Sequence, residues 1–405
     1  MTINRRQLIA TMASTALLAG NRASFAQGSG IFRIGAPNCI TGAGAAYGTG
    51  TQKMLQAGVE AVNAAGGAAG LKFEISTEDT QTQPQAAVLA VKKLIEVNKV
   101  QALLGIWSSG ESLATLPLAS DADLLFMNTS GAPALSVPPA NAKGLSYRFQ
   151  ATNDRFGRAF AEIAEKEGFK RPATMAFNNA SGIGNTEGFR KAWEKKGGKV
   201  VEAVVYEPNQ SSYRSELQKV LAAKPDVIVT GSYIADTTII LREWYQTGDA
   251  QKWIIPGWAA NSDLIKAIGP QVAEGIISVE SVSNEGSDAF KAYDAAYQKA
   301  MNAPGLGNAY AAMAWDMVIV LALAIEAAGK ADTAAINARI REIANPPGMA
   351  VATFAEGKAA LKAGKINYEG ASSALDFDQF GDVTPDFSMS AIENGKIIRK
   401  YVVKI

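Results

Sequence analysis

The stretch IFRIGAPNCITGAGAAYGTGTQKMLQAGVEAVNAAGGAAGLKFEISTEDTQTQPQAAVLAVKKLIEVNKVQALLGIWSSG, residues 31–110, decides the fold. Three short runs of strand character (31–36, 71–77 and 100–104) alternate with two segments of helical spacing, 52–65 and 84–95. A double glycine ends the first helix, and a proline begins the second. A β-α-β-α-β series of this kind requires a parallel sheet with right-handed crossovers.

The same series recurs about 130 residues further along the chain. The second copy predicts strands at 173–177, 200–206 and 227–230, with helices at 187–196 and 213–222. Gly197-Gly198 follows its first helix as Gly66-Gly67 follows the helix of the first copy, and the irregular segment 131–152 separates the two copies. We therefore expect an α/β protein of two Rossmann-like lobes, each a mainly parallel sheet flanked by helices. A single long doubly wound sheet is the alternative.

The last quarter of the chain adds helices and a hairpin. Residues 309–328 form a long apolar run, but Asp316 and Glu326 interrupt it, so it predicts a buried core helix rather than a membrane span. A further helix is expected at 332–343. Two strand-like segments, 386–393 and 396–403, meet at Asn394-Gly395, which is a strong hairpin signal.

Residues 1–26 have the pattern of a signal peptide. Arg5 and Arg6 precede the apolar run 8–19, and small residues place the cleavage site near Ala26. The paired arginines also fit a twin-arginine signal, so both export routes stay open. An N-terminal membrane anchor is the alternative, but the run is too short for the roughly 30 Å of hydrocarbon. We expect an exported, periplasmic protein whose mature chain does not insert into a membrane.

Composition excludes several functions. The chain contains no histidine and a single cysteine, Cys39, so it cannot build a Ser-His-Asp triad, a Cys-His dyad, a histidine zinc site or an internal disulfide. Without the basic residues of the signal, 36 basic residues face 38 acidic ones, which does not favour a nucleic-acid partner. We expect a binding protein without metal or cofactor rather than an enzyme.

Glycines 42, 44 and 48 follow the first strand and precede the first helix, as in a dinucleotide-binding turn. The acidic residue that binds the ribose should follow about 20 residues later, at the end of the second strand. Glu78 and Asp79 lie more than 30 residues further on. The turn fits a cradle for another small polar group as well as it fits a nucleotide site.

Polar residues follow the strands of both expected copies, where open α/β sheets bind ligands. The candidate polar residues are Ser108, Ser109, Thr129, Ser130, Gly131 and Asn178. The candidate aromatic walls are Tyr47, Trp107, Tyr233 and Trp258. For the two serines the alternative is a helix cap, and for each aromatic it is core packing. Together the strand ends of two lobes predict a ligand-binding cleft between them.

Several pieces of the chain resemble the leucine/isoleucine/valine-binding protein family. They are VEAVNAAGG (59–67), Glu78-Asp79-Thr80 with Pro84 and Ala86-Ala87, and VQALLGIWSSG (100–110). The resemblance runs from about Ile31 to the C-terminus. It implies a type I periplasmic-binding fold, with two lobes joined by three crossover strands and closing on a solute by a hinge. It also implies residues 27–151 and 282–383 in lobe 1, and 152–281 and 384–405 in lobe 2.

The resemblance also implies roles for individual residues. Ser109 matches the serine that binds the ligand carboxylate, Thr129 to Gly131 match the next ligand loop, and Tyr47 and Tyr233 match aromatic residues of the two lobes. Ile183 stands where the family often has a cleft-lining aromatic. Gly257-Trp258 stand where amino-acid binders carry the acid that pairs with the α-ammonium.

A buried ammonium needs a counter-charge. Asp154 and Asp236 are the remaining candidates, and we expect both to be ordinary solvated or capping residues. The missing acid makes an aromatic or apolar carboxylate, or another small neutral solute, an alternative to an amino acid.

The resemblance implies a monomeric solute-binding component of an ABC importer that delivers its solute to an inner-membrane permease. An exported sensor that reports the solute to a membrane receptor is the alternative. An enzyme is a third hypothesis, but neither a catalytic motif nor a general base supports it.

Overall fold

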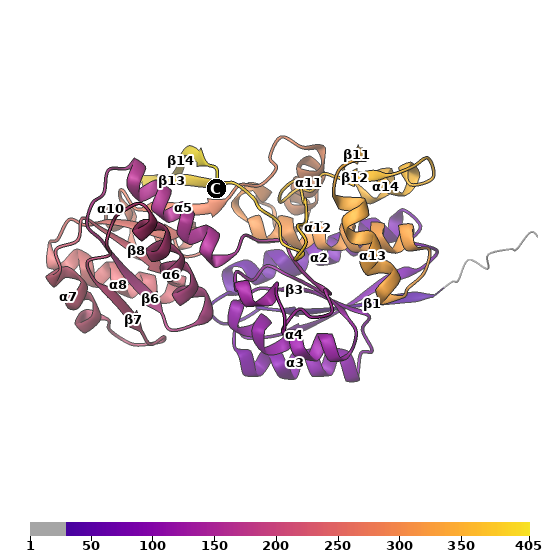
Figure 1. Ribbon diagram of the computed structural model, residues 1–405, viewed down its shortest axis with the longest axis horizontal. Helices are drawn as coiled ribbons and strands as arrows, with labels where there is room; N and C mark the ends of the chain where they lie inside the picture. The colour runs from indigo at the N-terminus through magenta and orange to yellow at the C-terminus, as the bar shows by residue number, and fades with distance from the viewer. Residues whose placement is uncertain (1–29) are drawn as a thin grey trace, which may run out of the picture.

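The computed structural model describes residues 30–405 as two α/β lobes side by side along the long axis of the molecule (Figure 1). One lobe contains a five-stranded sheet in the order β2-β1-β3-β4-β5, in which all neighbouring strands are parallel. The other contains a seven-stranded sheet in the order β14-β13-β10-β9-β8-β6-β7, parallel from β10 to β7 and antiparallel at β13 and β14. Two separate sheets exclude the single-sheet alternative and confirm the expected fold class.

The first sheet and its cover comprise β1 (Ile31–Asn38), α2 (Ala45–Ala64), β2 (Lys72–Asp79), α3 (Pro84–Glu96), β3 (Ala102–Ile106), α4 (Ser109–Asp121), β4 (Leu125–Asn128), the 3-10 turn η1 (Pro133–Leu135) and β5 (Ser146–Arg148), and later α11 (Asp288–Met301), η2 (Gly305–Gly307), α12 (Ala309–Ala328), α13 (Thr333–Ala344), β11 (Met349–Val351), α14 (Phe354–Ala360) and β12 (Ile366–Tyr368). The second comprises α5 (Asn153–Lys166), β6 (Pro172–Phe177), α6 (Ala180–Lys195), β7 (Ala203–Tyr206), α7 (Arg214–Ala222), β8 (Val227–Gly231), α8 (Ile234–Thr247), β9 (Lys252–Pro256), α9 (Ser262–Ile268), α10 (Pro270–Ala273), β10 (Ile277–Ser281), β13 (Phe387–Glu393) and β14 (Lys396–Val403). The expected signal peptide, residues 1–26, lies outside the described residues.

The two-residue hairpin turn has the expected backbone. Asn394 and Gly395 both adopt positive φ, +50° and +74°, as a type I′ turn requires, and β13 and β14 pair on either side of them. The expected strand 200–206 is shorter in the structure. In the structure β7 comprises only residues 203–206 and lies at the edge of its sheet, beside β6.

Helix α6 begins at Ala180, seven residues before the expected start at Glu187. The sequence misleads here because Gly182 and Gly184 in the first turn look like loop residues. In the structure a Cβ on Gly182 would lie 2.4 Å from the carbonyl oxygen of Phe177, so only glycine lets the helix start this close to the sheet. Asn179 caps the helix by accepting a hydrogen bond from the Gly182 amide at 2.7 Å.

Helix α12 is the buried core helix that the sequence predicts. It lies against α2 in the interior of the first lobe, and Val318 contacts α2 where Gly58 leaves room for it (Figure 1). It is long and apolar enough to cross a membrane, but most of its apolar length is buried inside the protein. Asp316 is fully buried within it and accepts hydrogen bonds from Tyr368, Ala371 and Ser372.

The chain passes between the two sheets three times, at 149–152, 282–287 and 369–386. These crossovers lie side by side. The Ser281 hydroxyl donates to Gln150 Oε1 at 2.7 Å, and the Val282 amide donates to the Asp386 carbonyl at 2.8 Å. Arg148 joins the first crossover to the third through an ion pair with Asp382, 2.8 Å between Nε and Oδ1.

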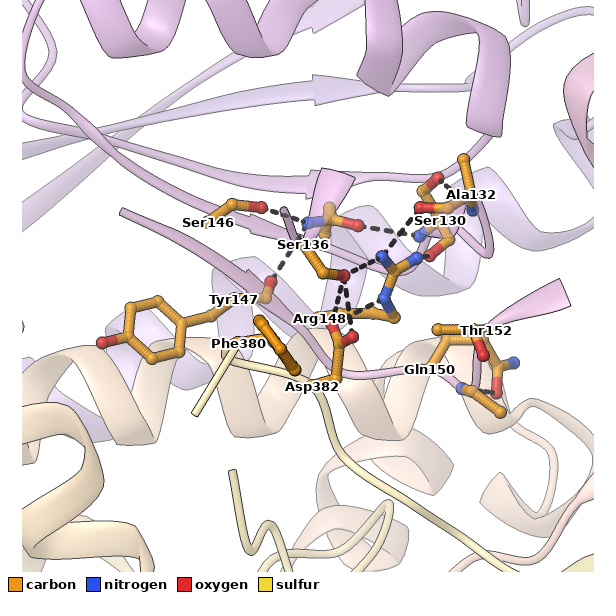
Figure 2. A network of polar contacts seen from close by, with 12 residues as sticks. Ser130, Ala132, Ser136, Ser146, Tyr147, Arg148, Gln150, Thr152, Phe380 and Asp382 are labelled. Carbon is orange, nitrogen blue, oxygen red and sulfur yellow. Dashed lines mark hydrogen bonds and ion pairs between the residues drawn. The ribbon is translucent and has the colours of Figure 1, made fainter. Parts of the chain in front are cut away.

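Arg148 is only 1% exposed and is surrounded by acceptors (Figure 2). Its guanidinium donates to the carbonyl oxygens of Ser130 and Ala132 and to the hydroxyl of Ser136, in addition to Asp382. A buried charge of this kind is tolerated because every direction of the guanidinium meets an oxygen. The loop after β4 is thereby fixed to the crossovers.

We expect Arg148→Met to lower the free energy of unfolding by about 3–5 kcal/mol, because it leaves a half-buried carboxylate and two carbonyls without their partner. Urea denaturation followed by circular dichroism measures the loss. Arg339→Met is the matched control: its ion pair with Glu342 is about half exposed on both sides and should contribute roughly 0–1 kcal/mol. Equal losses in the two variants would contradict the structural role of Arg148.

Candidate functional site

A small pocket lies between the two lobes, at the carboxyl ends of their strands. Both lobes and the first crossover line it. The lining residues are Trp107, Ser108, Ser109, Thr129, Gly131, Gln150, Ala151, Asn153, Phe156, Ser181, Tyr233, Trp258 and Tyr310. Seven residues that the sequence singles out are therefore brought together: Trp107, Ser108, Ser109, Thr129, Gly131, Tyr233 and Trp258.

One end of the pocket is the N-terminus of α4. Ser108 is the cap of this helix: the Ser108 hydroxyl accepts a hydrogen bond from the Glu111 amide, and the Glu111 carboxylate accepts one from the Ser108 amide at 3.1 Å. The capping alternative for Ser108 is thus correct, although the residue also borders the pocket. The next amides, those of Ser109 and Gly110, have no partner within the helix and are free to bind an anion.

Ser109 presents a hydroxyl at this end of the pocket. Its side chain is 1% exposed, and its oxygen accepts a hydrogen bond from the Ser130 hydroxyl at 3.3 Å. Because Ser130 supplies that proton, the Ser109 proton is left to donate to a ligand. Ser130 therefore lies behind Ser109 and does not line the pocket, whereas Thr129 and Gly131 on either side of it do.

Aromatic rings form the walls. Trp107 of the first lobe lies 5.3 Å from Tyr233 of the second, and Tyr310 stands edge-on to Trp107 at 5.9 Å, measured between ring centroids. Trp258 is held in place because its indole nitrogen donates to the Ser232 carbonyl at 3.0 Å and Phe156 packs against its ring. Burial raises the pKa of the Tyr233 and Tyr310 hydroxyls, so both remain uncharged donors.

Tyr47 does not line the pocket but lies behind Trp107 and Tyr310. Its hydroxyl donates to the Gly257 carbonyl at 3.3 Å and accepts from Asn261 Nδ2 at 2.7 Å. Both partners belong to the other lobe. These bonds and the Trp107–Tyr233 contact join the two lobes beside the pocket.

Two other expected residues lie elsewhere. Asn178 is exposed and donates to Glu207 at 2.5 Å. Ile183 lies in the first turn of α6 but does not reach the pocket, which Ser181 borders instead. The strand-end pattern suggests Asn178, and the family resemblance suggests Ile183. In the structure Asn178 lies between β6 and the Asn179 cap of α6, and Ile183 lies within that helix, where successive side chains point in different directions.

None of the described residues that line the pocket is charged. Asp154 is half exposed and pairs with Arg158, as expected of an ordinary surface residue. Asp236 differs from the expectation: it is buried and accepts hydrogen bonds from Tyr213 and the Asn209 amide, away from the pocket. Neither supplies a counter-charge to a bound cation.

Glu280 is the acidic group next to Gly257. A Cβ on Gly257 would lie 2.6 Å from Glu280 Oε2, so the glutamate side chain from β10 occupies the space that a larger residue at 257 would fill. It faces the groove on the Tyr47 side and is not among the residues that line the pocket. Burial raises the pKa of Glu280 to about 7.

The glycine-rich turn before α2 serves packing. A Cβ on Gly48 would lie 1.8 Å from the Cys39 carbonyl oxygen, and one on Gly44 would lie 2.6 Å from the Trp107 ring. The Asp79 carboxylate accepts from the amides of Ile40 and Thr41, both at 3.1 Å. Because the protein itself uses these amides, the turn does not offer the phosphate cradle of a nucleotide site.

Six lining residues lie outside the sequence-based candidates: Gln150, Ala151, Asn153, Phe156, Ser181 and Tyr310. Gln150 and Ala151 belong to the crossover after β5, inside the segment 131–152 that looks irregular in the sequence, and Asn153 begins α5. Tyr310 lies in the first turn of a core helix about 160 residues further on. Hydrophobic periodicity does not indicate the crossover residues or Tyr310, because the crossover is not periodic and α12 is apolar on every side.

Two similar lobes that enclose a small uncharged pocket define a two-lobed solute-binding protein. The chain belongs to the family described as periplasmic binding protein, whose model matches residues 32–365. This membership confirms the resemblance found in the sequence and the expectation of a binding protein rather than an enzyme.

Leu/Ile/Val-binding protein homolog 3 of Brucella melitensis is 24% identical over 399 residues, which cover 97% of this chain and 98% of that protein. A leucine-binding protein of Thermotoga maritima shares the fold with a TM-score of 0.80 at 22% identity, over 92% of this chain and 99% of that one. A solute-binding protein from R. palustris, solved in complex with benzoate, also shares the fold. Its TM-score is 0.74 at 20% identity, over 92% of this chain and 96% of that one.

The raised pKa of Glu280 makes stability depend on pH. The folded protein keeps a proton on Glu280 that the unfolded chain releases at its ordinary pKa, so this group lowers the free energy of unfolding as the pH rises from about 4.5 to about 7. We expect the free energy of unfolding of Glu280→Gln, relative to that of the wild type, to increase by roughly 2 kcal/mol from pH 5 to pH 8 in urea denaturation. Glu342→Gln, at the surface, is the control. If the difference in the free energy of unfolding between Glu280→Gln and the wild type does not change with pH, Glu280 is ionised throughout this range.

Proposed function

We propose that this protein is the exported solute-binding component of an ABC importer and that its solute is a small carboxylate with an apolar or aromatic body and no ammonium group. Residues 1–26 would direct export, and an inner-membrane permease would receive the closed form. The pocket carries this proposal: donors gather at one end of it, aromatic rings form its walls, and no acidic side chain of residues 30–405 lines it.

The donor end suits a carboxylate. Free amides at the start of α4 and the hydroxyls of Ser109 and Thr129 border the same end of the pocket. Anions are favoured at a helix N-terminus by the unpaired N–H groups and by the helix dipole. These neutral donors bind a carboxylate without placing a lysine or arginine in the pocket.

The absence of a lining carboxylate disfavours an amino acid. An α-ammonium enclosed here would lose its hydration, and that loss costs several kcal/mol unless an acid pairs with it. Gly257 offers no side chain, and Glu280 beside it lies behind the lining residues Gln150 and Tyr310 and does not itself line the pocket. The benzoate complex of the R. palustris protein supports an aromatic carboxylate, whereas the names of the leucine-binding relatives favour the amino-acid alternative.

We expect Ser109→Ala to weaken the binding of benzoate, or of any other carboxylate that binds, by about 1–3 kcal/mol, because a buried carboxylate loses a donor. Isothermal titration calorimetry measures the change. Asn178→Ala, whose side chain contacts Glu207 outside the pocket, should bind as the wild type does. Unchanged affinity in Ser109→Ala would remove this residue from the site.

A matched pair of solutes tests the ammonium directly. Leucine and 4-methylpentanoate share one carbon skeleton and one carboxylate, and they differ only in the α-ammonium. We expect 4-methylpentanoate to bind at least about tenfold more tightly, since one unpaired buried charge costs more than about 1.4 kcal/mol. Tighter binding of leucine would contradict the proposal and would point to Glu280 as the counter-charge.

A further inference from the structure

Gln150 occupies a place at the pocket that neither the sequence pattern nor the family resemblance assigns. It follows β5 by two residues, on the first crossover between the lobes, beside the Arg148 network (Figure 2). Its side chain is 2% exposed, and it borders the pocket. Long amides are seldom buried this fully unless they are hydrogen-bonded.

The orientation of the Gln150 amide is fixed by the protein. Its oxygen accepts a hydrogen bond from the Ala151 backbone amide at 2.8 Å and another from the Ser281 hydroxyl at 2.7 Å. A backbone N–H can only donate, so the atom that faces Ala151 must be the oxygen. The NH₂ group, Nε2, consequently points the other way.

Nε2 has no partner within hydrogen-bonding distance among the described residues, although it is buried and the Glu280 carboxylate and the Tyr310 hydroxyl lie nearby. A buried donor without a partner costs about 1–3 kcal/mol, and a solute that supplied an acceptor would recover that free energy. Gln150 therefore favours an oxygen on the solute.

We propose that Gln150 Nε2 donates a hydrogen bond to a second acceptor on the solute, separate from the carboxylate that the α4 end binds. This inference rests on the proposed function and deepens it: the solute class is a small carboxylate that carries one further oxygen, such as a ring hydroxyl or a keto group. Ser281 is the positioning residue that holds the amide in this orientation, and it ties the donor to the second crossover.

Two matched sets of solutes test this proposal by calorimetry on the full-length mature protein. The three monohydroxybenzoates are compared with benzoate, and 2-oxo-4-methylpentanoate is compared with 4-methylpentanoate. In the wild type, at least one oxygen-bearing solute should bind about tenfold or more tightly than its parent. In Gln150→Leu, that advantage should vanish, while the parent carboxylate binds within about threefold of its wild-type affinity.

Ser281→Ala keeps the test decisive should Gln150→Leu fail to fold, because it removes one of the two hydrogen bonds that hold the amide and should reduce the same advantage without removing a pocket side chain. The inference is overturned if no oxygen-bearing solute binds more tightly than its parent, or if the advantage survives in Gln150→Leu. Folded wild-type protein that binds none of these carboxylates would contradict the proposed function itself. The Ser109→Ala variant distinguishes failure of the Gln150 inference from failure of the proposed function, because it should weaken the binding of the parent carboxylates and of the oxygen-bearing solutes alike.

Discussion

The buried guanidinium of Arg148 is the interaction on which the arrangement of the site depends. It donates hydrogen bonds to two carbonyl oxygens of the loop after β4. It also forms an ion pair with Asp382, on a crossover more than 200 residues further along the chain (Figure 2). Thr129 and Gly131 reach the pocket from that loop. A single charged group thus connects the loop that borders the pocket to the segments that join the lobes, and the oxygens around this group offset the cost of its desolvation.

The pocket itself is built from neutral groups. Hydroxyls and helix amides supply the donors, and rings from both lobes close over them, so affinity would come from shape and from hydrogen bonds that form only when the lobes are together. Tyr47 contributes to closure rather than to the wall, through its bonds with Gly257 and Asn261 of the opposite lobe. Acidic groups near the site are kept from charging easily: burial raises the pKa of Glu280, and Glu111 shows a shift in the same direction.

Glycine allows this close assembly at a few positions. Gly48 and Gly182 permit helices to begin almost in contact with the backbone of the sheet, and Gly257 leaves the space that Glu280 fills. The first two look like loop or nucleotide signals in the sequence. Their actual cause is steric, and it becomes visible only when the chain segment on the other side of each glycine is known.

The amino-acid sequence alone determined the class of fold, because a β-α-β-α-β pattern that occurs twice allows few topologies, and it located the strand ends where Ser109, Thr129 and Tyr233 stand. It could not determine which side chains meet across the two lobes. Gln150, Asn153 and Tyr310 reach the pocket from a crossover and from a distant helix, through contacts that no local period encodes. Tertiary structure also placed Tyr47 behind the wall, where it bonds to the other lobe, and turned Asn178 toward Glu207, because the partners of both side chains are distant in the sequence.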